Sequence, residues 1–403
     1  MKVEIQPGFS FLTFFVFLAL AVVAVVIVPS PAHAQAFTVL YNFGEPASGY
    51  DASTNVIFDP SGNLYSTTDL GGANPSDDFG TVFELSPDGT ETILHNFIYT
   101  PDGSDGVNPA AGLVRDSAGN LYGTTSLGGT SDEGAIFKID SAGNETILHN
   151  FAGGTTDGAY PGPGNLIIGS ARNLYGTTTL GGAFGFGTAY ELSPGGTLTV
   201  LYSFTGGDDG GSPESGLVMD SSGNLYGTTL NGGKSQSNCG CGVVFRLSPH
   251  GSGGWQETVL HSFSGGTDGQ FPYAGLALNQ NRLFGSTGRG GAGNCGVVFE
   301  VGTNGNERVL YSFSSQGSED GCYPTGVLPV EGVLYGTTAL GGAFGQGSIF
   351  ALNASGTVTL LHSFDSSTDG SGPNGLARGP KGLYGTTPLG GTNNQGTVFK
   401  IAP

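Results

Sequence analysis

Positive charge and tryptophan are scarce in this sequence. Its 403 residues include 12 Lys and Arg against 32 Asp and Glu, together with one Trp and four Cys. Nucleic acids and anionic membranes are bound through clustered Lys and Arg, so neither is an expected partner of a chain with a net charge of −20. Apolar residues also lack a helical period after residue 34, which argues against a helical fold.

One long apolar run is present, and it lies at the N-terminus. Phe11–Val28 is almost uninterrupted apolar sequence, and Ala32 and Ala34 follow at the spacing of a cleavage site for small residues. We predict a signal peptide over residues 1–34, cleaved after Ala34, and a secreted protein that is extracellular or periplasmic. A retained membrane anchor is the alternative, because about 18 apolar residues approach the length of a membrane span.

A repeat accounts for the rest of the chain. The string LYGTT and its variants begin at seven leucines that are 49 to 58 residues apart: Leu64, Leu121, Leu174, Leu225, Leu283, Leu334 and Leu383. Within one period, such as Gly112–Phe151, four short strand-like runs are separated by Gly, Asn and Ser turns. This pattern predicts four strands, A to D, and the period is typical of one blade of a β-propeller.

The strand count predicts how the repeat closes. Strands B, C and D each occur seven times, but the last unit ends after strand C, and an unpartnered strand D, FTVLYNF, stands at residues 37–43. Seven complete blades result only if this segment pairs with Gly396–Ile401. We therefore predict an all-β fold: a single domain over residues 35–403, forming a seven-bladed β-propeller of four-stranded antiparallel blades closed by the N-terminal strand.

Aromatic residues recur once in each of strands B, C and D. They account for 21 of the 42 Phe, Tyr and Trp residues and are interpreted as packing between blades. One position of strand D holds either His or Tyr: His95, His149, His261 and His362, or Tyr41, Tyr202 and Tyr311. Interchange with Tyr argues for packing at these histidines and against catalysis.

Residues 37–403 resemble the Gloeobacter–Verrucomicrobia (GloVer) tandem repeats. The resemblance rests on GNLYGTT, on GG followed by GTVFEL, and on ETVLHSF, with a DGxxP motif between units. It implies an exported bacterial surface protein with a β-propeller-like fold. Many such proteins carry a C-terminal sorting anchor, whereas this sequence stops at Pro403, directly after its last strand, so we expect soluble export. The resemblance implies no particular activity.

Loops that vary between repeats often mark the binding face of a repeat protein. The B–C and D–A connections vary here and are predicted to share one face, whereas the A–B turns are short and alike. Six D–A loops contain an Asp-Gly pair, with the acids at Asp105, Asp157, Asp209, Asp268, Asp320 and Asp369. These carboxylates are expected to form a ring near the mouth of the central channel that binds Ca²⁺ or a polyol, or else each Asp makes a tight turn and satisfies backbone N–H groups.

Aromatic residues lie among these carboxylates in the loops. The candidate ligand-binding residues are therefore Asp157, Tyr160, Asp268, Phe271, Tyr273, Asp320, Tyr323, Phe184 and Phe344. Aromatic rings beside carboxylates suit carbohydrate, because sugar C–H faces stack on the rings while hydroxyl groups bond to the acids. The alternative is that these rings pack on the neighbouring blade.

The four cysteines form an even set, as expected of disulfides in an exported chain. All map to the variable face, where the loops that hold Cys295 and Cys322 adjoin. Cys295–Cys322 is the preferred pair, and Cys239–Cys241 is the second. A zinc site is not expected, because one residue between Cys239 and Cys241 is too few for a structural pair of ligands.

These features predict an exported, monomeric binding or surface-interaction module. Carbohydrate is the favoured ligand, another extracellular protein is a second partner class, and Ca²⁺ is the one cofactor considered. A polysaccharide lyase or hydrolase that uses loop carboxylates is the alternative. The absence of His from the predicted binding face argues against a Ser-His-Asp triad there. A purely structural exported repeat protein is the third hypothesis.

Overall fold

The computed structural model describes residues 36–44, 48–73, 78–109, 111–234, 239–251 and 253–402. Contacts divide the chain into two units, Met1–Ala34 and Gln35–Pro403. The predicted signal peptide and its cleavage site at Ala34 lie outside the described residues. The described part of Gln35–Pro403 consists of strands, turns and loops.

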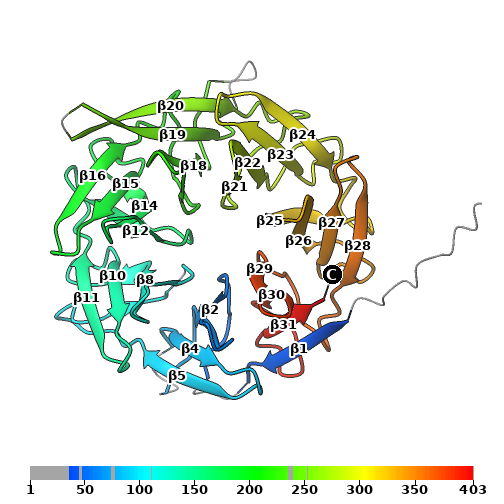
Figure 1. The fold of residues 1–403 in the computed structure, drawn as a ribbon, viewed down its shortest axis with the longest axis horizontal. Coiled ribbons are helices and arrows are strands. Elements are labelled where there is room, and N and C mark those ends of the chain that lie inside the picture. The colour runs from blue at the N-terminus through cyan, green and yellow to red at the C-terminus, as the bar shows by residue number, and fades with distance from the viewer. Residues whose placement is uncertain are drawn as a thin grey trace, which may run out of the picture. The chain divides into compact units, whose positions relative to one another are not determined.

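Seven four-stranded antiparallel blades follow one another around a ring, with strand A innermost and strand D outermost in each blade (Figure 1). In blades one to four the strands are, from A to D, β2 (Ile57–Phe58), β3 (Leu64–Thr68), β4 (Thr81–Leu85) and β5 (Glu91–Asn96); β7 (Val114–Arg115), β8 (Leu121–Thr125), β10 (Ala135–Ile139) and β11 (Glu145–Asn150); β13 (Ile167–Ile168), β14 (Leu174–Gly181), β15 (Thr188–Leu192) and β16 (Leu198–Ser203); β17 (Val218–Met219), β18 (Leu225–Thr229), β19 (Val243–His250) and β20 (Gly254–Ser262). Blades five to seven contain β21 (Ala277–Asn279), β22 (Arg282–Ser286), β23 (Val297–Gly302) and β24 (Glu307–Ser312); β25 (Cys322–Val330), β26 (Val333–Leu340), β27 (Ser348–Leu352) and β28 (Val358–Ser363); β29 (Ala377–Gly379), β30 (Gly382–Thr387), β31 (Thr397–Ile401) and β1 (Phe37–Asn42).

The first strand completes the last blade. β1 runs antiparallel to β31, with Phe37 opposite Ile401 and Asn42 opposite Thr397. In Figure 1 the blue β1 lies along the red β31, so segments from the two ends of the chain share one sheet. The predicted seven-bladed, all-β propeller and its closure by the N-terminal strand are confirmed.

The D–A and B–C connections of each blade are joined on one face, here called the loop face. The D–A loop pairs with the segment that follows strand B, as β6 (Gly106–Val107) with β9 (Leu127–Gly128) and β12 (Gly158–Pro161) with β14. Single bridges such as Gly211 to Asn231 take this place in other blades. The A–B and C–D turns lie on the opposite face, here called the turn face.

Neighbouring blades are held together by a repeated aromatic contact. The Phe that ends strand D meets the aromatic residue of strand C in the next blade edge-on, as Phe97 meets Phe137 with ring centroids 5.1 Å apart. The strand B glycine makes room for this ring, since a Cβ at Gly123 would lie 2.5 Å from the Phe137 ring. This confirms that the repeated aromatics of strands C and D are packing residues.

The glycine of the Asp-Gly pair also has a steric reason. A Cβ at Gly106 would lie 2.1 Å from Oγ1 of Thr125, the last residue of strand B. The same close approach to this Thr occurs in all seven blades, at Gly49, Gly106, Gly158, Gly210, Gly269, Gly321 and Gly370. The repeated DG pair is therefore part of the scaffold.

Deletion of residues 37–43 should open the ring. The loss of β1 leaves β31 as an unpaired edge and removes Phe43, which is fully buried against Phe83. We expect a loss of about 5 kcal/mol or more in the free energy of unfolding, measured by urea denaturation, because truncating one buried Phe alone costs about 3–5 kcal/mol. Phe344→Ala, which changes an exposed aromatic residue, should stay within about 0.5 kcal/mol of the parent. A deletion variant that melts like the parent would contradict the closed ring.

Candidate functional site

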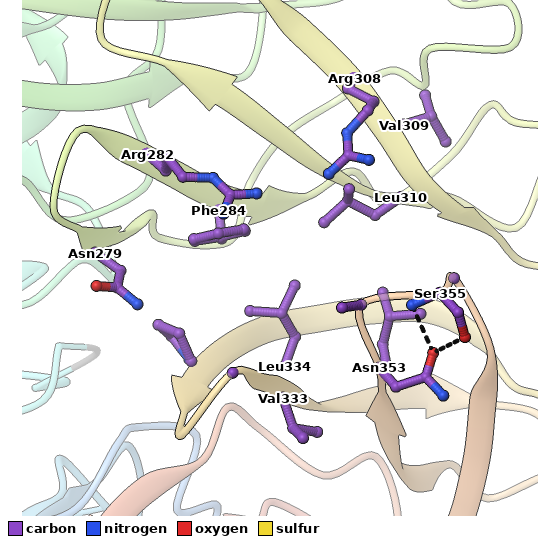
Figure 2. Close-up of a pocket in the computed structure, with 15 residues that line it drawn as sticks. Asn279, Arg282, Phe284, Arg308, Val309, Leu310, Val333, Leu334, Asn353 and Ser355 are labelled. Carbon is purple, nitrogen blue, oxygen red and sulfur yellow. Dashed lines mark hydrogen bonds between the residues drawn. The ribbon is translucent and has the colours of Figure 1, made fainter.

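Three hollows stand out among the described residues. The central channel holds a cavity of about 520 Å³ that is lined by residues from each of the seven blades. An open groove of about 440 Å³ lies on the loop face and shares Pro163 and Glu214 with the channel. A third cavity, of about 290 Å³, lies between blades five and six on the turn face (Figure 2).

The groove on the loop face combines an aromatic ring, an aliphatic side chain and a carboxylate. Its lining includes Tyr160 from the D–A loop that leads into blade three, Leu180 from β14, and Glu214 from the next D–A loop. Tyr160 is 37% exposed and Leu180 is 42% exposed. Burial raises the pKa of the Glu214 carboxyl group.

The backbone holds Tyr160 in an unusual conformation. Its φ is 53°, in the left-handed region, and its N–H donates to the carbonyl of Glu133 in the preceding blade at 2.9 Å. The same position is left-handed in every blade, at Asp51, Asn108, Tyr160, Ser212, Phe271, Tyr323 and Gly372. A bulky residue rarely has this conformation, and the hydrogen bond to the neighbouring blade fixes the direction in which its side chain leaves the loop.

Two further apolar side chains, Phe184 and Phe186, are exposed on the loop face of blade three. Leu180 pairs with Ala159, and Gly181 forms a bridge with Phe186 in the B–C loop. Phe184 and Phe186 in this loop are 58% and 46% exposed. Blade three therefore presents an exposed apolar surface, the blade-three patch, which consists of Tyr160, Leu180, Phe184 and Phe186.

The channel next to the groove is almost uncharged, and its lining mixes polar side chains with Leu, Ile and Val. Amide and hydroxyl side chains line it, among them Asn55, Asn165, Ser215 and Asn374. Glu214 is the one charged residue in its described lining. Such a surface offers hydrogen-bond donors and acceptors without a strong field.

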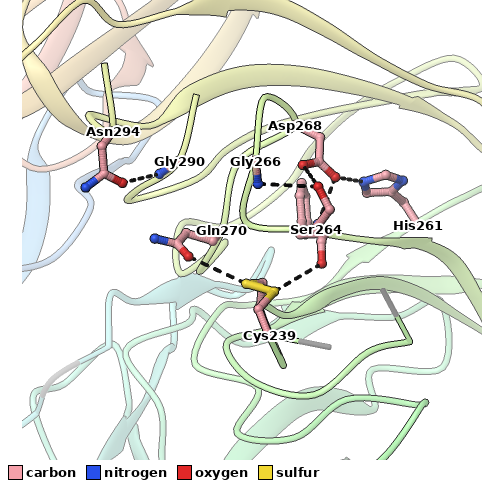
Figure 3. Close-up of a disulfide and its surroundings, with 10 residues drawn as sticks. Cys239, His261, Ser264, Gly266, Asp268, Gln270, Gly290 and Asn294 are labelled. Carbon is pink, nitrogen blue, oxygen red and sulfur yellow. Dashed lines mark hydrogen bonds and ion pairs between the residues drawn. A yellow bond between two sulfur atoms is a disulfide. The ribbon is translucent and has the colours of Figure 1, made fainter. Parts of the chain in front are cut away.

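The Asp of each D–A loop is held by the strand D that precedes it. Asp157 accepts hydrogen bonds from the backbone N–H groups of Ala152 and Gly158 at 3.0 and 2.8 Å, and His149 Nε2 lies 3.1 Å away. Burial alone would raise the pKa of Asp157, but the bonds from His149 and the backbone outweigh it and hold the pKa below the usual range. Figure 3 shows the same arrangement at Asp268, which lies between His261 and Ser264.

The alternation of His and Tyr in strand D follows from this contact. Tyr311 donates its hydroxyl to Asp320 at 2.8 Å, just as His362 Nε2 lies 2.6 Å from Asp369. Either side chain can present a donor to the loop carboxylate. The expectation that the loop face lacks His is corrected, because these histidines reach the loop carboxylates from strand D.

The expected ring of carboxylates at the channel mouth is wrong. The six Asp residues lie against the outermost strands, and none of them lines the channel cavity. Their oxygens are occupied by hydrogen bonds within each loop. Among the described residues, no group of three or more His, Cys, Asp or Glu could hold a metal ion.

The predicted aromatic residues are distributed over several blades. Tyr273 lines the channel and donates its hydroxyl to the carbonyl of Pro324 at 3.2 Å, and Arg289 lies over the Tyr323 ring at 5.8 Å. Phe271 is half-buried, and its N–H donates to the carbonyl of Cys241. Phe344 is exposed on blade six. Of the nine predicted residues, the structure places Tyr160 in the groove and Phe184 on the surrounding patch.

Sequence reasoning missed Glu214 and Leu180, and it left Phe186, an aromatic residue of the same B–C loop as Phe184, out of the candidate residues. A signal for Glu214 was present, because the position after the DGxxP proline holds an uncharged residue in the other five DGxxP repeats. Its proximity to Tyr160, however, depends on how one blade abuts the next. Glu214 is the one charged residue in the described lining of the groove.

The cysteines form two disulfides on the loop face. Cys295 is bonded to Cys322 across the junction of blades five and six, and Cys239 is bonded to Cys241 within the B–C loop of blade four. The carbonyl of Cys295 also accepts the N–H of Tyr323 at 3.0 Å. The first disulfide therefore fastens a contact between blades that other junctions make by hydrogen bonding alone.

The two disulfides should contribute unequally to stability. The chain-entropy model gives about 3 kcal/mol for a loop like that of Cys295–Cys322, with a sequence separation of 27, and much less for Cys239–Cys241, with a separation of 2. The double variant Cys295→Ser, Cys322→Ser should therefore unfold at clearly lower urea concentration than Cys239→Ser, Cys241→Ser. Four alkylatable thiols in the native protein would contradict both bonds.

Four junctions between blades contain a half-buried glutamate near the start of strand D. Tyr41 donates its hydroxyl to Oε2 of Glu91 at 2.8 Å, while Oε1 is buried without a hydrogen-bond partner. The same Oε1 lacks a partner in Glu145, Glu257 and Glu307. Burial raises the pKa of Glu91 to about 7, and burial together with nearby Asp105 has the same effect on Glu145.

These glutamates predict a pH dependence of stability. A carboxyl whose pKa is raised in the folded state stabilises it below the unfolded pKa, and this contribution is lost as pH rises through the folded value. We therefore expect the free energy of unfolding to fall between pH 5 and pH 8. Urea denaturation at each pH measures this change. Glu145→Gln should flatten part of this slope, and Glu319→Gln, on the exposed surface, should leave it unchanged. A stability that rises over this range would contradict the assignment.

The fold and the loop-face site define a β-propeller repeat protein. A family model described as the Gloeobacter/Verrucomicrobia repeat matches residues 26–167, 154–331 and 234–403. The chain belongs to this family, as its motifs predict. No curated protein matches it.

Solved structures share the fold at low identity. A protein of Bacteroides uniformis that is assigned as a 6-phosphogluconolactonase matches with a TM-score of 0.52 and 16% identity, over 80% of this chain and 89% of that chain. The extracellular domain assigned to a hybrid two-component system of B. thetaiotaomicron matches with a TM-score of 0.55 and 12% identity, over 90% of this chain and 39% of that chain. Identities this low show a common fold alone. The described residues contain no helix of the length and hydrophobicity that a membrane crossing requires.

Proposed function

We propose that this protein is an exported binding module whose ligand is a carbohydrate, bound in the loop-face groove of Tyr160, Leu180 and Glu214. The observation that carries the proposal is the combination of an exposed aromatic ring and a carboxyl group in one groove, at the edge of the central channel.

The two halves of the site match the two surfaces of a sugar. The blade-three patch offers rings for the apolar C–H face, and its three aromatic residues are all exposed. Glu214 and the channel amides offer partners for the hydroxyl groups. A polysaccharide chain could lie on the patch with one residue directed toward the channel.

Export forms part of this proposal. We infer that residues 1–34 are a signal peptide removed after Ala34, and that residues 35–403 act as one domain outside the cytoplasm. One matched structure is an extracellular domain, which is in keeping with this location.

The proposal predicts the effect of removing the ring. Tyr160→Ala should lower the affinity for a glycan found on an array about fivefold, because loss of a stacked ring costs about 1 kcal/mol. Titration calorimetry measures this change, and Glu214→Gln should weaken binding as well. Phe344→Ala is the matched control, since it removes an exposed loop-face ring from blade six.

Two results would contradict the proposal. One is the absence of glycan binding on the array and in calorimetry, with and without Ca²⁺. The other is cleavage of a polysaccharide that is abolished by Glu214→Gln, which would make the protein an enzyme.

A further inference from the structure

The cavity between blades five and six has an apolar floor and a cationic rim. Phe284 of β22, Leu310 of β24 and Leu334 of β26 form its floor, as Figure 2 shows. Arg282 and Arg308 lie along one side, and Asn353 and Ser355 lie on the other. The cavity opens on the turn face, opposite the groove proposed to bind carbohydrate.

This junction departs from the repeat at the positions that line the cavity. In blades one, two and four the Asp before the A–B turn accepts the hydroxyl of the strand B tyrosine, as Asp220 accepts Tyr226 at 2.9 Å. In blade five the tyrosine is replaced by Phe284, and the turn Asn279–Arg282 contains no acid. Blade five therefore lacks the carboxylate and the hydroxyl group that meet in blades one, two and four, and it has Arg282 at this turn.

The charge at the rim is positive on a protein with a net charge of −20. Glu300 forms ion pairs with Arg282 and with Arg308, whose Nη2 lies 2.8 Å from Oε2. Arg282 also lies over the Phe284 ring, 5.2 Å from its centroid. Two cations and one anion leave one positive charge, and both guanidinium groups retain N–H donors that Glu300 does not use.

We propose that this cavity binds an organic carboxylate with an apolar body. The fork of guanidinium donors suits a carboxylate, and the floor of Phe284, Leu310 and Leu334 suits a ring or a short alkyl chain. This is a second binding site, on the opposite face of the propeller from the carbohydrate groove, and it does not depend on the first.

A second junction shows the same combination. A cavity of about 240 Å³ between blades seven and one is lined by Leu40, Tyr384, Lys381 and Lys400. Four of the 12 cations in the sequence therefore line two equivalent cavities. The arginine cavity is the better carboxylate site because Lys ammonium groups act as point charges without a planar fork.

The test is titration calorimetry with benzoate, and with benzamide as an uncharged ligand of the same shape. Benzoate should bind, benzamide should not, and higher salt should weaken binding. Arg308→Gln should lower the affinity tenfold or more, with a smaller loss for Arg308→Lys. Glu300→Gln should raise the affinity for benzoate, because removal of the carboxylate frees guanidinium donors and makes the net charge of the site more positive by one unit.

The double variant Lys381→Gln, Lys400→Gln is the matched control and should bind benzoate like the parent. The absence of benzoate binding would overturn the proposal. So would binding that is lost in the lysine variant and kept in Arg308→Gln, or binding that Glu300→Gln leaves unchanged. Thermal melting of each variant identifies any that are unfolded, and Glu300→Gln then provides an independent test because it predicts a gain.

Discussion

The Phe that ends strand D and the aromatic ring of strand C in the next blade meet edge-on at all seven junctions, with centroids 5.0 to 5.4 Å apart. Each such pair contributes about 0.5–1.5 kcal/mol beyond the burial of its area. The strand B glycine, the strand D register and the closure by β1 all serve to bring these rings together. A blade contacts little besides its two neighbours, so the stability of each blade depends on the ring being complete.

Most repeated residues have a structural task that the contacts identify. The Asp of the D–A loop caps backbone N–H groups and holds a His or Tyr, and its glycine fits against a buried Thr. Function is therefore sought where one blade differs from the others. Glu214 in blade four and Phe284 with its two arginines in blade five are such departures, and each lies beside a hollow.

The fold could be predicted from the sequence because the residues that determine it recur in each repeat. Counting strands located the missing strand at Phe37–Asn42, which pairs as expected. The prediction of a ring of carboxylates was wrong because the repeat pattern places each Asp on the correct face of the propeller but does not give its distance from the central axis. That distance depends on the contact between Asp157 and His149, a strand D residue eight positions earlier, and on the equivalent contacts in other blades. The groove could not be predicted, since Tyr160, Leu180 and Glu214 come together only through the contact between two blades.

The pairing of β1 with β31 also governs the order in which the protein can fold. Phe37 and Ile401 lie near the two ends of the part of the chain that the structure describes, so the contact between them spans a very large sequence separation. Most strand pairs within a blade are local hairpins, whereas the ring cannot close until its final strand is available. Until then β1 is a strand of FTVLYN that lacks its partner β31, and an unpaired strand of this kind is open to pairing with other chains.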